Sequence, residues 1–310
     1  MAVQVILNPY AGRWKARKRI PEVHAALRAA GIDYHLVETQ GPRHAIDLAA
    51  QAVRDGSEAV FAAGGDGTIG EVVNGLGQAA SPGSPLPVPL GVFPLGSAND
   101  FAVNLGLPLD LNQAAMCCKT GRTRRIDLGQ VMYSNGQDHL NTCFFDNNSA
   151  VGLEPSITLI QQKIPFLHGA LRYLLATLIG VLRSPHWEAV LEWEGGSYHG
   201  PVSLVTVGNN PLTGGLFYMT PHADPSDGQL TFVYGYMRTR PQILRLLPRT
   251  MKPGAGSYIE HPAIHEVNSP WLRISTQQPT PLHADGEIQH PALRQVEYRA
   301  CPGMLAVFIP

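Results

Sequence analysis

Cysteine pairs, excess charge and long apolar runs are all missing from this sequence, and each absence excludes a class of protein. The 4 cysteines form no C-x-x-C pair, so we expect neither a zinc site nor a disulfide framework. The formal net charge is −1, which does not favour nucleic acid as a partner. The most apolar stretch, Phe166 to Pro185, is interrupted by histidine and arginine, so we expect no transmembrane segment.

The N-terminal sequence MAVQVILNPYAG has no basic leader followed by a long apolar core. It therefore predicts no signal peptide, and together with the unpaired cysteines it favours a cytoplasmic location. The chain of 310 residues is long enough to form two domains, each with its own apolar core.

The first part of the chain alternates strand-like and helix-like segments. This alternation predicts βαβ units and a parallel sheet, in which ligands bind at the carboxyl ends of the strands. Asn8, Thr39 and the segments GGDGT and GSAND all follow expected strands, so we expect them to lie along one edge of the sheet. The expected strands are 3–7, 33–39, 58–62 and 90–93.

Strand-like runs dominate after Arg124, which predicts a mostly antiparallel second domain. We therefore expect a nucleotide-binding α/β domain at 1–123 and a mostly β domain at 124–310, with a final strand that could return to the first domain. Helices are expected at 157–182 and 240–249. The expected strands are 126–132, 140–145, 189–193, 203–207, 230–236, 272–275, 295–299 and 304–309.

A glycine-rich turn follows the third expected strand. The sequence AAGGDGTIGEVVNGLG, Ala62 to Gly77, predicts the end of a strand, a turn, and a helix with one apolar face. Thr68 and Glu71 have the spacing of a capping box at the start of that helix. Such a turn directs backbone N–H groups and the positive end of the helix dipole at one point, where a phosphate can bind.

This turn differs from the familiar phosphate loops because Asp66 stands between its glycines. Asp66 can serve a ligand that brings Mg²⁺, a ribose or an acceptor hydroxyl, or it can hydrogen-bond its own turn. Ser97 and Asn99, after the fourth strand, also have two interpretations. They can be helix N-caps, or they can add donors to the same phosphate site.

Two segments are candidates for contact with an anion or a membrane surface. In the basic segment Gly12 to Arg19, most cations are expected on a solvated helix face, whereas Arg13 and Lys15 can reach a phosphate or an anionic headgroup. A later apolar helical segment is a candidate for lipid docking, with core packing as the alternative. Its residues are Phe166, Leu167, Tyr173, Leu174 and Leu175.

Two acidic loops lie in the second part of the chain. Asp224 and Asp227 precede a strand and can form a structural metal loop or a turn with solvated carboxylates. Asp285 and Glu287 flank a glycine, which suits a tight hairpin. Alternatively, Glu287 can act as a general base for a hydroxyl acceptor, with Asp285 beside it near Mg²⁺. The scattered histidines are expected to be structural or exposed.

Taken in order, these motifs resemble the diacylglycerol kinase catalytic-domain superfamily, which includes soluble bacterial diacylglycerol kinases, YegS-like lipid kinases, and sphingosine and ceramide kinases. The resemblance covers nearly the whole chain. GGDGT alone also occurs in NAD kinases and phosphofructokinases, but its combination with G-S/T-x-N-D and D-G-E is much more specific for lipid kinases. The matching segments are 8–12, Thr39, 44–45, 64–75, 94–102, 124–129, 209–217, 223–230 and 284–287.

The resemblance implies a Rossmann-like, phosphofructokinase-like N-terminal domain, a β-sandwich-like C-terminal domain, and an ATP- and Mg²⁺-dependent lipid kinase. It implies that Glu287 takes the proton of the acceptor and that Asp66 lies near the reacting phosphates. The residues implied for nucleotide binding are Asn8, Thr39, Gly64, Gly65, Asp66, Gly67, Thr68, Ser97, Asn99 and Asp285. Those implied for a structural Mg²⁺ are Asp224, Asp227 and Gln229.

The sequence departs from the family pattern where Gly70 replaces an asparagine and Val103 replaces an arginine. The expected partner is a lipid substrate at a membrane surface, reached by peripheral association. Whether the chain forms a homodimer is left open. Two alternatives also stay open: a kinase for a soluble hydroxyl substrate such as NAD, and a catalytically silent nucleotide-binding regulator.

Overall fold

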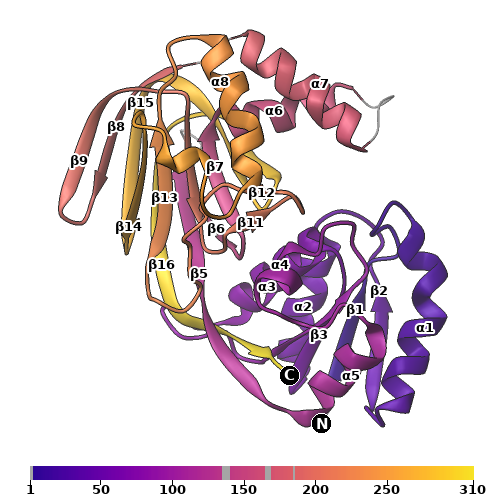
Figure 1. The fold of residues 1–310 in the computed structure, drawn as a ribbon. Coiled ribbons are helices and arrows are strands. Elements are labelled where there is room, and N and C mark those ends of the chain that lie inside the picture. Colours follow the sequence, from indigo (N-terminus) through magenta and orange to yellow (C-terminus); the bar gives the residue numbers. More distant parts are fainter. Residues whose placement is uncertain (1–2, 135–139, 165–168, 184–185) are drawn as a thin grey trace. The chain divides into compact units, whose positions relative to one another are not determined.

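The computed structural model describes residues 3–134, 140–164, 169–183 and 186–310 (Figure 1). The chain forms two compact units, the first made of Met1–Leu128 and Cys301–Pro310 and the second of Gly129–Ala300. Two long strands run from one unit into the other, β5 (Thr123–Ser134) and β16 (Glu287–Phe308). The expected division into a nucleotide-binding kinase domain at 1–123 and a mostly β lipid-substrate domain at 124–310 stays a prediction.

The first unit contains the predicted parallel sheet, with strand order β4-β3-β1-β2. Every residue of β3 and β4 is buried, as expected for strands that helices cover on both faces. Val307 of β16 pairs in parallel with Leu90, so the last residues of the chain extend this sheet. The strands are β1 (Val3–Leu7), β2 (Tyr34–Glu38), β3 (Ala59–Gly64) and β4 (Leu90–Pro94).

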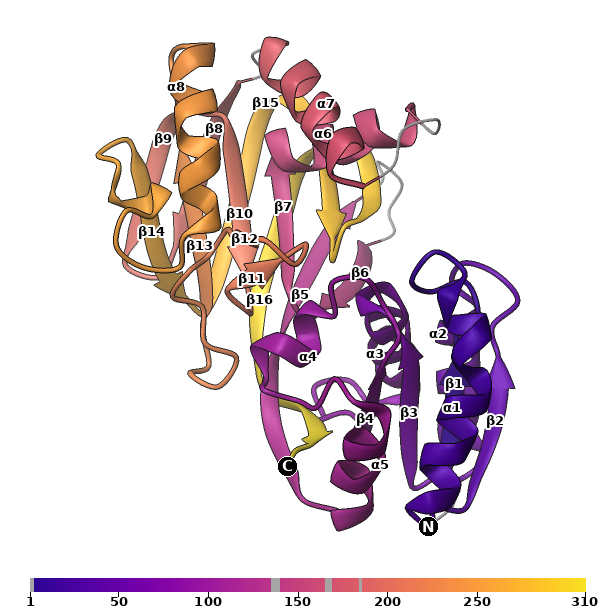
Figure 2. The ribbon, with the colours of Figure 1, turned by 45° about the vertical axis from the view of Figure 1, so that its right-hand side comes forward.

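Helices cover both faces of this sheet. Side chains of α1 (Lys15–Ala29) and α5 (Leu111–Thr120) share one apolar core with β1, β3 and β4. Helices α2 (His44–Arg54) and α3 (Asp66–Ala79) pack against each other on the other face (Figure 2). Gly75 permits this approach, because a Cβ there would lie 2.3 Å from the carbonyl oxygen of Ile46.

The second unit is the predicted β-sandwich-like domain, and its sheet forks at β15 (Trp271–Ala284). The first part of β15 pairs with β8, and its last residues pair with β7. Side chains from both branches meet in one apolar core. The other main strands are β6 (Leu140–Phe145), β7 (Asn148–Gly152), β8 (Trp187–Trp193), β9 (Gly196–Val202), β10 (Leu204–Gly208), β13 (Leu230–Gly235) and β14 (Ile264–Ser269), with short β11 (Leu212–Thr213) and β12 (Phe217–Tyr218).

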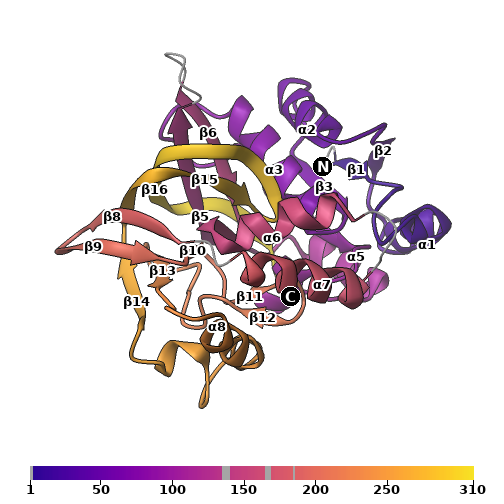
Figure 3. The ribbon, with the colours of Figure 1, turned by 90° about the horizontal axis from the view of Figure 1, so that it is seen from above.

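Three helices of the second unit, α6 (Leu153–Gln162), α7 (Gly169–Leu182) and α8 (Arg240–Leu246), gather around a separate apolar cluster (Figures 1 and 3). The prediction of one helix over 157–182 was wrong, because α6 ends before Ile164. The proline at position 165 disfavours helical backbone in the residue that precedes it.

The apolar segment expected to dock on lipid lies partly outside the described residues, which include neither Phe166 and Leu167 nor the side chains of Tyr173 and Leu174. Leu175 is half-buried and packs against the cluster of α6, α7 and α8. Within the described residues, no helix is both long and apolar enough to span a membrane.

Candidate functional site

Backbone hydrogen bonds join the segments that follow the parallel strands of the first unit. The amide of Asn8 donates to the carbonyl oxygen of Ala63 at 2.9 Å, and the amide of Thr39 donates to the carbonyl oxygen of Leu7 at 2.8 Å. The Asn8 side chain then reaches into the glycine turn, where its Nδ2 donates to Oγ1 of Thr68 at 3.0 Å. The structure therefore brings Asn8, Thr39 and the GGDGT turn to one edge of the sheet.

The GGDGT and GSAND turns touch through their backbones. A Cβ on Gly65 would lie 3.0 Å from Cα of Gly96, and a Cβ on Gly96 would lie 2.6 Å from Cα of Gly65. Both glycines are therefore needed for the two turns to approach each other. The amide of Leu95 also donates to the carbonyl of Gly64 at 2.7 Å, which fixes the start of the second turn beside the first.

Gly67 differs from its neighbours because a Cβ there would meet no atom within 4 Å. It is exposed and lies in the first turn of α3, which begins at Asp66. Amides in the first turn of a helix lack a carbonyl partner from a preceding turn, and the helix dipole adds positive potential at this end. The open space beside Gly67 is therefore suited to an anion such as a phosphate.

The Asp66 carboxylate connects the two turns. Its Oδ1 accepts a hydrogen bond of 3.0 Å from the amide of Phe101, in the first turn of the short helix α4 (Asp100–Asn104). Of the interpretations left open for Asp66, the one in which it hydrogen-bonds its own turn is not what this contact shows, because the acceptor serves the neighbouring helix start. Asn99 is the residue before α4, and its Oδ1 accepts from the amide of Gly96 at 2.9 Å, while Ser97 is exposed.

The predicted capping box of Thr68 and Glu71 is absent. Oxygens of the Glu71 carboxylate accept from the amides of Arg43 and Ala45, at 2.8 and 3.1 Å. Glu71 therefore caps the start of α2, because tertiary packing brings the free amides of that helix within reach. The same bonds attach α3, and with it the glycine turn, to the segment that follows Thr39.

Thr39 contributes a buried hydroxyl to this edge of the sheet. Its side chain is buried, and Oγ1 has no hydrogen-bond partner within the described part of the chain. A buried polar atom usually has a partner, so an orphaned hydroxyl at this edge fits a site where a ligand supplies one.

The basic segment begins beside these turns. A Cβ on Gly12 would lie 2.7 Å from the carbonyl oxygen of Leu95, so the loop before α1 packs on the end of β4. Arg13 and Lys15 are exposed, as are Arg17 and Lys18 farther along α1. Their roles in binding a phosphate or a headgroup stay predictions.

In the second unit, Asp285 and Gly286 form the two-residue turn between β15 and β16. Their φ angles are 46° and 79°, and Ala284 pairs with Glu287 across the turn. Two consecutive positive φ angles define a type I′ hairpin, for which Asp-Gly is a preferred sequence. The hairpin interpretation is therefore correct, and it places the exposed Glu287 on the first residue after the turn.

Asp285 is held by backbone amides of the loop before β7 and of the first residue of that strand. Its Oδ2 accepts from the amide of Asp146, and its Oδ1 accepts from those of Asn147 and Asn148, each at 3.0 Å. Burial raises the pKa of the carboxyl to about 6, although the three amides and His283 act to lower it. This side chain organises a loop, and its expected place beside the nucleotide stays a prediction.

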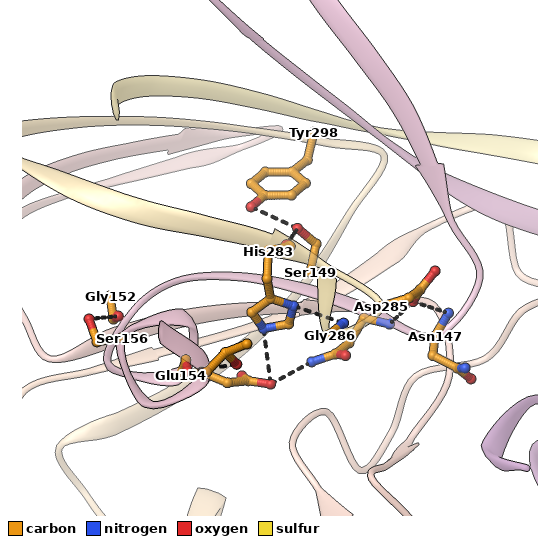
Figure 4. Close-up of polar contacts among 11 residues, drawn as sticks. Asn147, Ser149, Gly152, Glu154, Ser156, His283, Asp285, Gly286 and Tyr298 are labelled. Carbon is orange, nitrogen blue, oxygen red and sulfur yellow. Dashed lines mark hydrogen bonds and ion pairs between the residues drawn. The ribbon is translucent and has the colours of Figure 1, made fainter. Parts of the chain in front are cut away.

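A buried polar network that the sequence did not reveal lies behind this turn (Figure 4). The amide of Gly286 donates to Nδ1 of His283 at 3.3 Å, and Nε2 of His283 lies 3.2 Å from Oε1 of Glu154. The same Oε1 accepts from Nδ2 of Asn148 at 2.9 Å. His283 stands next to the ADGE motif, and that proximity was the one signal available in the sequence.

Burial alone would raise the pKa of Glu154, but the neighbouring His283 and the hydrogen bond from Asn148 outweigh it. The pKa of this carboxyl is therefore held below its ordinary value, and Glu154 is ionised at neutral pH.

The loop expected to bind a structural metal shows turn chemistry. Oδ1 of Asp224 accepts from the amide and the hydroxyl of Ser226, and Oδ1 of Asp227 accepts from the amide of Gln229. No group of three or more His, Cys, Asp or Glu side chains that could hold a metal occurs in the described ranges. A magnesium site at Asp224, Asp227 and Gln229 stays a prediction.

Comparison with known proteins assigns a family to both parts of the chain. The diacylglycerol kinase catalytic domain matches residues 2–131, and the YegS C-terminal NAD kinase beta sandwich-like domain matches residues 148–309. A protein of Chromohalobacter salexigens named "Probable lipid kinase YegS-like" is 30% identical over 302 residues, covering 94% of this chain and 90% of its own.

One further relative agrees with this assignment, and a solved structure shares the fold. The diacylglycerol kinase of Bacillus subtilis is 29% identical over 286 residues, covering 92% of this chain and 89% of its own. A crystal structure of a diacylglycerol kinase from Bacillus anthracis has the same fold, with a TM-score of 0.72 at 19% identity, covering 100% of this chain and 97% of that one. The chain therefore belongs to the family of YegS-like lipid kinases and bacterial diacylglycerol kinases.

Proposed function

We propose that this chain is an ATP-dependent lipid kinase that transfers the γ-phosphate of MgATP to a hydroxyl of diacylglycerol or a related lipid. The observation that carries the proposal is the open space beside Gly67, at the start of a helix in a chain of a kinase family. A phosphate bound there would receive backbone N–H groups without displacing any protein atom.

Each proposed nucleotide contact follows from a feature of the first unit. The turn from Gly64 to Thr68 would hold the phosphates, and the orphaned hydroxyl of Thr39 would bond another part of the nucleotide. Asn8 would act through Thr68, to which it donates. Ser97 and Asn99 would extend the same site from the neighbouring turn.

Bound Mg²⁺ would neutralise phosphate charge, which is the main electrostatic requirement of phosphoryl transfer. Asp66 carries the carboxylate of the GGDGT turn. The amide of Phe101 donates to its Oδ1 and not to its Oδ2. It is therefore the residue we propose to lie near the reacting phosphates.

Glu287 is the proposed general base. It is exposed at the start of β16, on a turn fixed from behind by Asp285 and His283. A carboxylate on a rigid turn can accept the proton of a lipid hydroxyl as that oxygen attacks the γ-phosphorus in line. A positioned base commonly contributes about 10²–10⁴-fold to such a step.

The test is transfer of label from [γ-³²P]ATP with Mg²⁺ to acceptors in mixed micelles. The panel would contain diacylglycerol, monoacylglycerol, phosphatidylglycerol, sphingosine, ceramide and undecaprenol, with NAD as a soluble acceptor. Label on a lipid supports the proposal and identifies the acceptor. Label on NAD alone contradicts it in favour of a soluble-substrate kinase, and ATP binding without any transfer contradicts it in favour of a silent regulator.

A further inference from the structure

We propose that Glu154 and His283 are positioning residues for Glu287: they form a carboxylate–histidine pair that fixes the Asp285-Gly286 turn from behind. This inference rests on the proposed function, because Glu287 must be the base for its position to matter. Both residues belong to the polar network beneath the turn (Figure 4).

The contacts assign the ring proton of His283. Its Nδ1 accepts from the amide of Gly286, so Nδ1 must be unprotonated and the ring proton of the neutral imidazole must be on Nε2. Nε2 lies 3.2 Å from Oε1 of Glu154, and the negative charge of that carboxylate favours the tautomer with its proton on this side of the ring. Protonation or rotation of the ring would place a donor against the Gly286 amide.

Burial and a hydrogen bond from Asn148 hold the Glu154–His283 pair in position. The His283 side chain is 2% exposed, and Glu154 is held by Asn148 through a hydrogen bond of 2.9 Å to the same Oε1. Asn148 also donates its amide to Asp285, the other residue of the turn. Glu154, His283, Gly286, Asp285 and Asn148 therefore form a closed ring of polar contacts.

A closed ring of this kind has a direct consequence for catalysis. Glu287 follows Gly286 immediately, and the turn has two positive φ angles, one of them at a residue with a side chain. Such backbone is strained unless its surroundings hold it. Hairpin pairing leaves the amide of Gly286 without an acceptor, and Nδ1 of His283 supplies one. The turn is thereby fixed, so that Glu287 keeps one orientation. Small displacements of a catalytic group can cost about 10²-fold in rate.

The test is a double-mutant cycle between Glu154→Gln and Glu287→Ala, assayed with MgATP and the lipid that accepts label in the panel, starting with diacylglycerol. Glu154→Gln should lower kcat by about 10- to 100-fold, leave the KM for MgATP unchanged, and have no further effect in the Glu287→Ala background. The matched control is Glu266→Gln, which breaks a different Glu–His pair of the same unit, the 2.6 Å contact with His222, and should leave kcat unchanged.

A conservative series at His283 separates positioning from packing. His283→Asn retains an acceptor close to the place of Nδ1, whereas His283→Leu does not, so the leucine variant should lose much more kcat. Amide exchange of Gly286 gives a second measurement that needs no activity, and it should be faster in both His283→Leu and Glu154→Gln than in the wild type.

The outcomes distinguish the two proposals. If Glu287→Ala does not lower kcat, the proposed base is wrong and the positioning inference falls with it. If Glu287→Ala lowers kcat but Glu154→Gln has the same effect in both backgrounds, or does not change Gly286 exchange, only the positioning inference is overturned.

Discussion

Replacing Gly67 with alanine should stabilise the first unit and weaken nucleotide binding at the same time. The new Cβ would meet no protein atom within 4 Å, so no steric cost is expected in the free protein. Gly67 lies inside α3, where alanine is favoured over glycine by about 1 kcal/mol. We therefore expect a small rise in the melting temperature.

The methyl group would occupy the space that we propose for a phosphate. Losing one hydrogen bond to a charged group costs about 1.5–3 kcal/mol, which corresponds to roughly a 10- to 150-fold weaker Kd. Calorimetric titration with MgADP would measure this change. Gly254→Ala is the matched control, because its Cβ also meets no atom within 4 Å and its φ is not left-handed.

A Gly67→Ala protein that is folded and binds MgADP as tightly as the wild type would refute the reasoning. Gly65→Val gives a weaker test, because its Cβ would lie 3.0 Å from Cα of Gly96. Valine there would push the two turns apart, so lost binding would not locate the phosphate.

Three further predictions concern packing and protonation. Gly75→Ala should destabilise the first unit by about 1–3 kcal/mol, measured by thermal melting, because its Cβ would lie 2.3 Å from the carbonyl oxygen of Ile46; an unchanged melting temperature would contradict the observed packing of α2 on α3. Asp285→Asn should cost about 1–3 kcal/mol in the second unit, since an amide N–H₂ would face one of the three donating amides; a melting temperature equal to the wild type would show that these bonds contribute nothing. The stabilisation from Glu154 should be fully present above its ordinary pKa of 4.5 and be lost as pH falls through its lowered folded value; if the stability difference between wild type and Glu154→Gln did not shrink at acid pH, the lowered pKa would be wrong.

The parallel sheet could be predicted because its strands and helices carry strong local patterns. β3 and β4 are continuous buried runs, and α3 has its apolar residues on one face. Glu71 shows the limit of such local patterns. Its spacing from Thr68 suited a capping box, but the amides of Arg43 and Ala45 are the partners that tertiary packing supplies.

The second unit was harder to predict because several of its strands lack a local signal. β7 has the sequence NSAVG, whose small and polar residues are buried by pairing with β10 and β15. β16 was expected as two short strands, 295–299 and 304–309, with Pro302 and Gly303 between them, yet it forms one strand. Long-range pairing overrides local propensity in both cases.

The motifs of the candidate site were visible in the sequence, but the buried side chains that hold the ADGE turn in place were not. ADGE marked the hairpin of Asp285 and Glu287, and the hairpin forms as its turn residues require. The pairing of His283 with Glu154 joins residues far apart in the chain, one on β15 and one on α6. No spacing rule connects such residues, so only the fold could show that they meet.

Whether Glu287 is the general base can be tested by the rate of phosphate transfer to diacylglycerol by Glu287→Ala, compared with the wild type at saturating MgATP. We expect kcat to fall by at least about 100-fold while the KM for MgATP stays within roughly threefold, because a base acts on the chemical step and not on nucleotide binding. A variant that transfers phosphate at the wild-type rate would contradict the account.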